Sequence, residues 1–277
     1  MCAKAAADDG GQALAQWRPF RHREAPPMSW SLLLLVLAAF AAGVQNALAG
    51  GGSFLTFPAL LVAGIDPRTA NIASTIALFP GQVTTGLAGR RHVAGAEGLS
   101  FRTLFWISLI GGAVGAVLLL VTPVSVFTHL VPFLVLFATL VFAWGSFFRK
   151  PRAEGAPPVL GRRAAMLVQG LIAIYGGYFG GGIGILMLAA LTAAGLGVRV
   201  AGATKNVLAA VMNASAVAIF LLRAHTLPWL PILCVAVPAI LSGQLGALLL
   251  HRVNEKALRV VIVCIGTALS IGLFLRG

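Results

Sequence analysis

Long stretches of this chain carry no charged residue, and that pattern decides which folds are open to it. Asp, Glu, Lys and Arg are absent from five intervals, which lie between residues 24 and 66, 68 and 90, 102 and 149, 163 and 199, and 223 and 252. Because 59% of the residues are hydrophobic and only 10% are charged, a water-soluble fold could not bury the apolar surface. We therefore expect a polytopic integral membrane protein.

The lengths of these intervals predict how often the chain crosses the membrane. About 20 apolar residues in a helix span the roughly 30 Å of bilayer hydrocarbon. Residues 103–148 are long enough for two crossings, with Pro123 and Pro132 bracketing a turn near residues 122–129. The expected fold is all-α with eight transmembrane helices, at residues 30–49, 69–89, 101–121, 129–148, 164–181, 200–222, 227–250 and 258–275.

The segment before the first helix lacks apolar periodicity and contains basic residues and prolines, which predicts a disordered cytoplasmic tail at residues 1–28. A secretory signal peptide ending at Ala47-Leu48-Ala49 is the competing interpretation. It is less favoured because cleavage would remove a feature that recurs later in the chain. The rest divides into a first transmembrane repeat at 29–148, a basic cytoplasmic linker at 149–163 and a second transmembrane repeat at 164–277.

Basic residues in short loops indicate which helix ends face the cytoplasm. The loop at residues 90–102 and the linker are basic, whereas the turn at residues 122–128 is uncharged. Eight crossings with both termini inside satisfy these observations. One basic loop, at residues 252–259, would then lie outside, against the rule. The net charge of +13 is spread over many loops, so it reflects membrane topology and not a nucleic-acid partner.

An internal repeat is visible in the glycines. The triplet Gly50–Gly52 recurs 130 residues later as Gly180–Gly182, each time after a long apolar helix. The same offset places Ala73–Ile76 on Ala203–Asn206. Two halves of four helices are therefore expected. An even number of helices leaves both halves in the same orientation, so we expect an axis along the membrane normal, as in parallel repeats.

Three motifs carry a family resemblance. They are the glycine break followed by Pro58, the segment Asn71–Thr75, and the segment Gly202–Asn206. With these motifs, residues 30–275 resemble the sulfite exporter TauE/SafE family of bacterial membrane permeases, although Ser74 and Thr75 are exchanged relative to the family pattern. The resemblance implies transport of sulfite, sulfonates or related small organic anions by a multi-pass protein of the bacterial inner membrane.

The first glycine triplet also has a meaning independent of the family. Residues 26–65 form an uncharged segment too long for one crossing and too short for two. We expect residues 30–49 to cross, Gly50–Ser53 to break the helix and Phe54–Gly64 to form a short re-entrant half-helix, with the same arrangement in the second half. Bare backbone at membrane depth is tolerated where it lines a cavity, and a helix start there favours an anion. The alternative is that the glycines only allow close helix packing.

The charged residues narrow the class of substrate. All seven acidic residues fall in the tail, in loops or at helix ends, which leaves no carboxylate for a cation pathway. Lys205 is the only basic residue well inside an expected helix. Its ammonium either offsets the charge of an anionic substrate, or reaches the outer interface by extending its side chain.

The resulting candidate substrate-binding residues are Gln45, Asn46, Gly50, Gly51, Gly52, Ser53, Ser74, Thr75, Gly180, Gly181, Gly182, Thr204, Lys205 and Asn206. Three further polar residues, Gln82, Asn213 and Gln244, could bind an anion or link helices. The three cysteines have no spacing typical of a metal site, so no metal or cofactor is expected. A cluster of His, Asp or Ser/Lys typical of an intramembrane enzyme is not found in the sequence either.

The function expected from these features is secondary transport of a small sulfur-containing or organic anion, without enzymatic activity. The alternative is a polytopic protein of structural or enzymatic role whose glycine breaks serve only helix packing. The expected partners are the anion, the lipid bilayer and, in a homo-oligomer, further copies of the chain. The sequence holds no nucleotide-binding motif, so ATP hydrolysis is not expected to drive transport.

Overall fold

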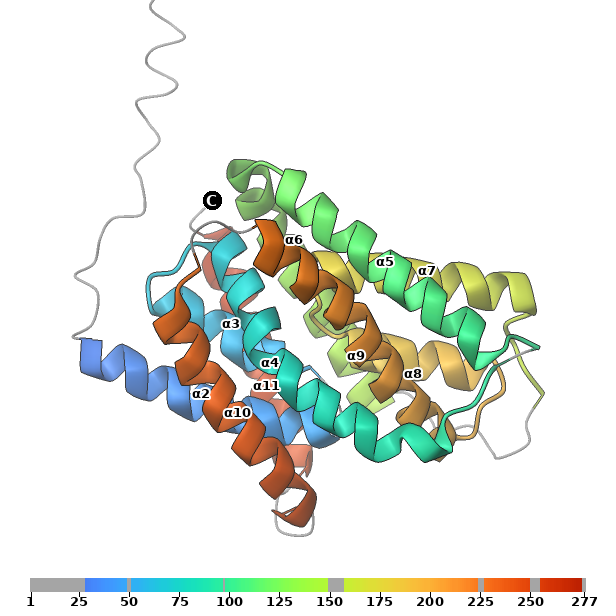
Figure 1. Ribbon diagram of the computed structural model, residues 1–277. Helices are drawn as coiled ribbons and strands as arrows, with labels where there is room; N and C mark the ends of the chain where they lie inside the picture. The colour runs from blue at the N-terminus through green and yellow to red at the C-terminus, as the bar shows by residue number, and fades with distance from the viewer. Residues whose placement is uncertain are drawn as a thin grey trace, which may run out of the picture.

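The computed structural model describes residues 28–48, 51–96, 98–148, 157–223, 227–249 and 255–275, so most of the expected tail and of the linker lies outside the described residues. Within these ranges the regular structure is helical (Figure 1). The α-helices are α2 (Met28–Leu48), α3 (Ser53–Val62), α4 (Pro67–Gly89), α5 (Phe101–Val121), α6 (Val124–Ala143), α7 (Arg162–Tyr178), α8 (Ile183–Ala193), α9 (Val198–Arg223), α10 (Trp229–Leu249) and α11 (Glu255–Phe274). A 3₁₀ turn, η1 (Arg90–His92), follows α4, and a π-helical turn, η2 (Trp144–Phe148), follows α6.

Each of the eight expected crossings coincides with one of these helices. Three helical segments of the described chain are long and apolar enough to span a bilayer by themselves: Phe101–Val121, Val124–Phe148 and Val198–Arg223. Shorter apolar stretches occur in α2, α3, α8, α10 and α11. Many large apolar side chains on the outside of the bundle are exposed, among them Trp30, Val121, Phe133 and Leu222, as expected for a surface solvated by lipid.

The expected turn between α5 and α6 is shorter than predicted. Pro132 does not border it, because α6 begins at Val124 and Pro132 lies inside this helix. The prediction treated proline as a helix breaker, but helices in membranes tolerate proline when neighbouring groups satisfy the freed carbonyl. Here Thr122 alone separates α5 from Pro123, the N-cap residue of α6.

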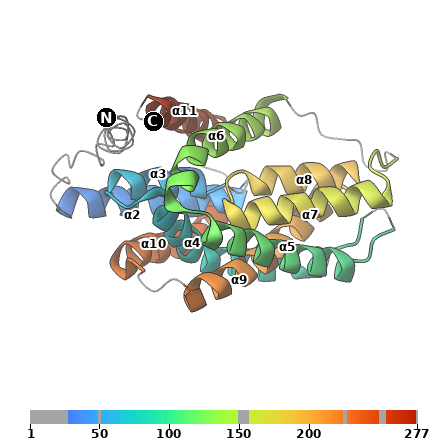
Figure 2. The same ribbon diagram turned by 90° about the horizontal axis from the view of Figure 1, so that it is seen from above.

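Two short helices follow the glycine breaks, at the predicted places. α3 has 10 residues and α8 has 11, so each is about half as long as the hydrocarbon layer is thick. In the second half the chain turns back after the break, and α8 lies beside α7 (Figure 2). The N–H groups of Val159 and Leu160, just before α7, both donate to the carbonyl of Ala193 at the end of α8. α8 therefore returns toward the end of the bundle at which α7 begins.

The helices of the two halves follow one another in the same order, so each helix has a counterpart: α2 and α7, α3 and α8, α4 and α9, α5 and α10, α6 and α11. The main contacts respect this correspondence. α2 packs on α10 and α7 packs on α5, while α4 packs on α9 and α6 on α11. Exchanging every helix for its counterpart leaves this set of contacts unchanged.

Hydrogen bonds at the helix ends refine the offset between the halves. After α3, the Ile65 N–H donates to the Leu60 carbonyl at 3.1 Å, and after α8 the Leu196 N–H donates to the Leu191 carbonyl at 3.1 Å. These turns are 131 residues apart, one more than the helix starts, because α8 is one residue longer than α3. The counterpart of Lys205 is therefore Ser74, and not Thr75 as a constant offset of 130 predicted.

Counterpart helices run in opposite directions where they meet. Gly89, at the end of α4, packs against Ala203 near the start of α9, whereas Asn213, farther along α9, donates to Gln82, which precedes Gly89 in α4. α4 and α9 are thus antiparallel. An axis along the membrane normal would leave counterpart helices parallel, so the expectation of parallel halves is wrong for this structure.

Opposite directions also change which loops share an end of the bundle. The guanidinium of Arg259, near the start of α11, donates to the Ser146 carbonyl after α6 at 3.3 Å. The Ala94 N–H, after α4, donates to the Thr204 hydroxyl near the start of α9 at 3.1 Å. Figures 1 and 2 show that α7 begins at this end too, whereas α2 begins and α11 ends at the opposite end. The expectation that the first helix and the linker start from the same side is therefore not met.

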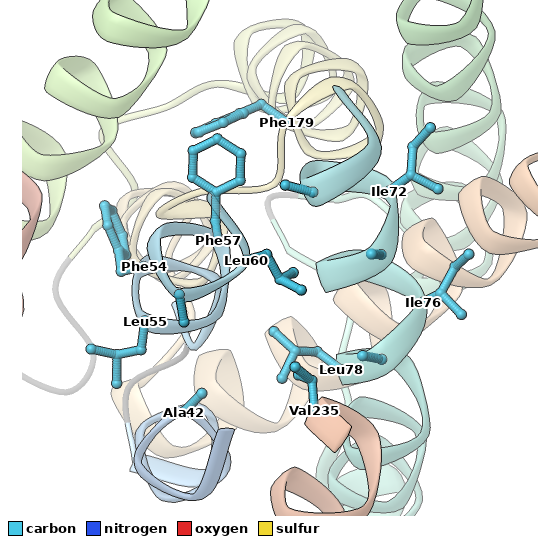
Figure 3. Packing of buried hydrophobic residues seen from close by; sticks show 14 of the residues in the cluster. Ala42, Phe54, Leu55, Phe57, Leu60, Ile72, Ile76, Leu78, Phe179 and Val235 are labelled. Carbon is cyan, nitrogen blue, oxygen red and sulfur yellow. The ribbon is translucent and has the colours of Figure 1, made fainter. Parts of the chain in front are cut away.

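In the buried core, α3 packs between α4 and the second glycine break. Figure 3 shows Phe57 of α3 pointing toward Phe179, and the two rings meet edge to face with centroids 5.5 Å apart. The Thr56 and Ser74 hydroxyls hydrogen-bond at 2.6 Å inside the same core. Apolar packing and one polar link thus hold the first half-helix against the break of the other half.

Candidate functional site

A cavity of about 40 Å³ lies where the two glycine breaks approach each other. Since about 10–15 Å³ of such space admits one water molecule, the cavity has room for a small solute of a few atoms. It lies between α2, α4, α8, α9 and the first break, and its lining residues are Asn46, Gly51, Gln82, Thr85, Ile183, Gly184, Lys205, Asn206 and Ala209. Residues of both halves therefore contribute to one small space.

Lys205 is the charged residue of this cavity. Its side chain is 6% exposed, and it has no hydrogen bond or ion pair to the part of the chain that the structure describes. The alternative in which Lys205 extends to the membrane interface is wrong for this structure, because an extended side chain would be exposed. An ammonium group buried without a counter-ion is costly, so Lys205 is a candidate for binding a negatively charged partner.

Hydrogen bonds within and next to the first break engage several of its backbone N–H groups. Gly51 has a φ angle of 91°, a left-handed conformation that glycine adopts without strain. The Gly52 N–H donates to the Asn46 side-chain oxygen at 2.8 Å, and the Phe54 and Leu55 N–H groups donate to the carbonyls of Gly51 and Gly52. The expectation that this break offers several bare amides is therefore not met at Gly52, Phe54 and Leu55.

The second break leaves amides open toward the cavity. Gly180 and Gly182 have φ angles of 80° and 74°, and Asn71 of α4 donates to the carbonyl of Tyr178 at 2.9 Å. Ile183 and Gly184, the first residues of α8, line the cavity, and their N–H groups have no acceptor among the described residues. The positive end of α8 therefore faces the same space as Lys205.

A second, smaller cavity separates the breaks on the side of α6 and α11. It measures about 10 Å³ and is lined by Ser53, Phe54, Phe57, Pro58, Val135, Phe179, Gly181, Gly266 and Leu269. The space suffices for about one water molecule, and most of its walls are apolar. Ser53 and Gly181 thus meet each other here, away from Lys205.

Several predicted site residues make other contacts. Ser74 bonds Thr56, the Thr75 hydroxyl donates to the Asn71 carbonyl in its own helix at 2.9 Å, and Thr204 accepts from the Ala94 N–H. Gln45 is buried in α2 without lining either cavity. Gly50 lies outside the described residues, as does the side chain of Gln244.

The cavity also contains residues that were absent from the predicted site. Thr85 follows Gln82 by three residues in α4, and Ala209 follows Lys205 by four in α9. This helical spacing places each pair on one helix face, so helical periodicity from Gln82 and Lys205 is the signal that points to them. Ile183 and Gly184 follow directly after the second glycine triplet.

Comparisons with known proteins agree with this architecture. Residues 35–273 match the family model described as sulfite exporter TauE/SafE. The chain is 32% identical over 249 residues to the probable membrane transporter protein ORF9 of a Sinorhizobium species, covering 87% of this chain and 92% of that protein. It is 30% identical over 238 residues to a probable membrane transporter protein of Haemophilus influenzae, covering 84% and 90%.

A third relative is more distant but equally complete. The probable membrane transporter protein YfcA of Escherichia coli is 26% identical over 243 residues, covering 86% of this chain and 87% of that protein. The match to the family model spans most of the chain, from α2 to α11, and includes every residue of the Lys205 cavity. The chain is therefore a polytopic membrane protein that belongs to the sulfite exporter TauE/SafE family.

Proposed function

We propose that this protein is a secondary transporter that moves a small sulfur-containing or organic anion, of the sulfite or sulfonate type, across the bacterial inner membrane. The observation that carries the proposal is the cavity in which Lys205 is buried without a counter-ion beside the start of α8. A cation at membrane depth, open backbone N–H groups and a lining without carboxylates together favour a negatively charged solute.

Each group of the cavity has a role in the proposed binding. The Lys205 ammonium supplies one full positive charge, and the Ile183 and Gly184 N–H groups supply hydrogen bonds and the helix dipole. The Asn206 amide adds a donor from the next position of α9. A sulfite or sulfonate group is acceptable on size, since its few heavy atoms suit a cavity of about 40 Å³.

The relation of the two halves supports a transport mechanism. We infer that residues 29–148 and 164–277 are inverted repeats of five helices each, four long helices and one half-helix, because counterpart helices such as α4 and α9 meet antiparallel. Inverted repeats around one central site are typical of secondary transporters, in which the site is exposed to each side in turn. The names of the relatives agree with this class, and the family description names sulfite.

The alternative, in which glycines serve packing only, applies to other glycines of the chain. Where α5 meets α7, a Cβ atom on Gly177 would overlap the Gly112 carbonyl oxygen, so these residues let two helices touch. The break residues Gly51, Gly180 and Gly182 instead have positive φ angles, which interrupt the helix. The glycines that let α5 and α7 pack closely are thus different from the glycines that interrupt the helices. The packing alternative therefore does not account for the two breaks.

Anion uptake into proteoliposomes tests the proposal. We expect saturable, inhibitable uptake of sulfite, sulfoacetate or small carboxylates by the wild type, and its loss in Lys205→Ala because no other cation among the described residues lines the cavity. Arg199→Gln is the matched control, since it removes a positive charge from an exposed position of the same helix. It should keep the wild-type KM. Unchanged uptake kinetics in folded Lys205→Ala protein would refute the assigned site.

A further inference from the structure

A side-chain hydrogen bond joins the two halves at the edge of the cavity. The Asn213 amide nitrogen of α9 donates to the Gln82 side-chain oxygen of α4 at 2.5 Å. With the offset of 131 residues, these two positions are counterparts of each other. Asn213 is only 3% exposed, whereas Gln82 lines the Lys205 cavity. The bond therefore connects a buried donor to a residue that borders the site.

This bond fixes which end of the Gln82 amide faces the cavity. A glutamine side chain has one acceptor oxygen and one NH₂ group with two donors. Because Asn213 engages the oxygen, the NH₂ group is the end left for the cavity, and it has no acceptor within the described residues. Asn213 thus orients the Gln82 amide so that its NH₂ group, and not its oxygen, faces the cavity.

Asn46 has the same arrangement on the other wall. Its side-chain oxygen accepts the Gly52 N–H, which leaves the Asn46 NH₂ group as its remaining polar end. The polar groups that these residues can offer to the cavity, together with Lys205, are then all donors. An acceptor oxygen of a solute finds a donor at each of these three residues, whereas a donor group of a solute finds none at them.

We propose that Gln82 binds the transported anion through its NH₂ group, and that Asn213 is a positioning residue that orients this group toward an acceptor oxygen of the anion. This inference rests on the proposed function and adds a specificity determinant to it. A bond that merely linked α4 to α9 would influence folding but not the affinity for the anion.

The experiment compares sulfite uptake by variants that replace the NH₂ group facing the cavity at position 82 with an oxygen. In Asn213→Asp the new carboxylate cannot donate, so it accepts from Gln82 and turns the Gln82 oxygen toward the cavity. We expect the KM for sulfite to rise about tenfold with the maximal rate retained, the loss of one hydrogen bond to a charged group. Gln82→Glu keeps an acceptor for Asn213 and the link between the helices, and should raise the KM at least as much.

A double variant and a matched control complete the design. Asn213→Asp should have no further effect on the KM once Gln82→Leu is present, because its action passes through Gln82. Gln169→Leu is the control: the Gln169 amide donates to the Ser108 hydroxyl between α5 and α7 at 2.9 Å, and Gln169 does not line the cavity. It removes a buried interhelical bond and should leave the KM within about twofold of the wild-type value.

The outcomes separate the inference from the proposed function. If Gln82→Glu and Asn213→Asp keep the wild-type KM while Lys205→Ala loses uptake, the inference is overturned and the proposed function stands. If Lys205→Ala also transports sulfite normally, the assigned site fails, and if the wild-type protein shows no saturable anion uptake, the proposed function itself fails. An increase in KM for Gln82→Glu that Gln169→Leu does not reproduce supports the inference, even where Asn213→Asp yields no folded protein.

Discussion

Burying the Lys205 ammonium costs free energy that other interactions of the molecule must offset. On insertion scales a lysine at the centre of a transmembrane helix costs about 2.5–3.5 kcal/mol, and Lys205 is 6% exposed with no ion pair in the described chain. Its counterpart in the first half is Ser74, a neutral residue whose hydroxyl is bonded to Thr56. The charge is thus present in one half only, and we propose that the two halves share one anion site.

At the scale of helices, α5 and α7 approach each other closely near the site. Gly111 and Gly115 of α5 face Ala173, Gly177 and their neighbours in α7, and a Cβ on either glycine would meet backbone or Cβ atoms there. Small residues at such a contact let helices associate through van der Waals packing in lipid. α7 ends at the second glycine break, so this contact also fixes where α8 begins.

Substituting Gly177 tests that contact. In Gly177→Ala the added methyl group would overlap the Gly112 carbonyl and force the helices apart. We expect a loss of about 1–3 kcal/mol of stability, seen as a lower unfolding temperature in detergent. Gly170→Ala in the same helix is the control, because its nearest neighbour is the Ile107 side chain at 3.8 Å. Equal unfolding temperatures for the two variants would show that the close approach of α5 and α7 does not stabilise the fold.

The sequence predicted the helices well because membrane thickness sets their length. α5 coincides with the predicted range 101–121, and the half-helices follow from a segment too long for one crossing. Lys205 and Asn46 were candidates because a charge or amide inside an apolar helix needs a partner, and both line the cavity, while their binding role stays a prediction. The sequence could not place Ser74, Thr75 or Thr204, because hydroxyl groups satisfy themselves on nearby backbone or side chains.

The direction of the second half also escaped prediction. The count of eight crossings assumed that the half-helices do not change the direction of the chain. Each half-helix instead leads the chain back toward the end of the bundle from which the preceding helix started, and so reverses the direction of the helices after it. That reversal explains the one loop that contradicted the positive-inside rule. Arg259 lies beside Ser146, at the end of the bundle that also holds the basic loop after α4 and the start of α7. We propose that this basic end faces the cytoplasm; α2 begins at the opposite end, so the expectation of a cytoplasmic tail before α2 is not met in this orientation.

Reporter fusions test the proposed orientation of the whole molecule. A fusion after Val253, between α10 and α11, should fluoresce as green fluorescent protein and be inactive as alkaline phosphatase, because α11 begins at the basic end. A fusion after Gly155 in the linker should behave in the same way, and one after Thr122 in the opposite way. Parallel halves predict active phosphatase after Val253, so that result would overturn the inverted arrangement.

One small oxyanion should bind between Lys205 and the start of α8, and anomalous diffraction can locate it. Crystals soaked in selenite, which shares its shape and charge with sulfite and scatters anomalously, should show a selenium peak in this cavity. We expect a selenite oxygen about 3 Å from the Lys205 Nζ atom and others near the Ile183 and Gly184 N–H groups. A saturating soak that leaves this cavity empty while selenium binds elsewhere in the bundle would rule out anion binding at Lys205.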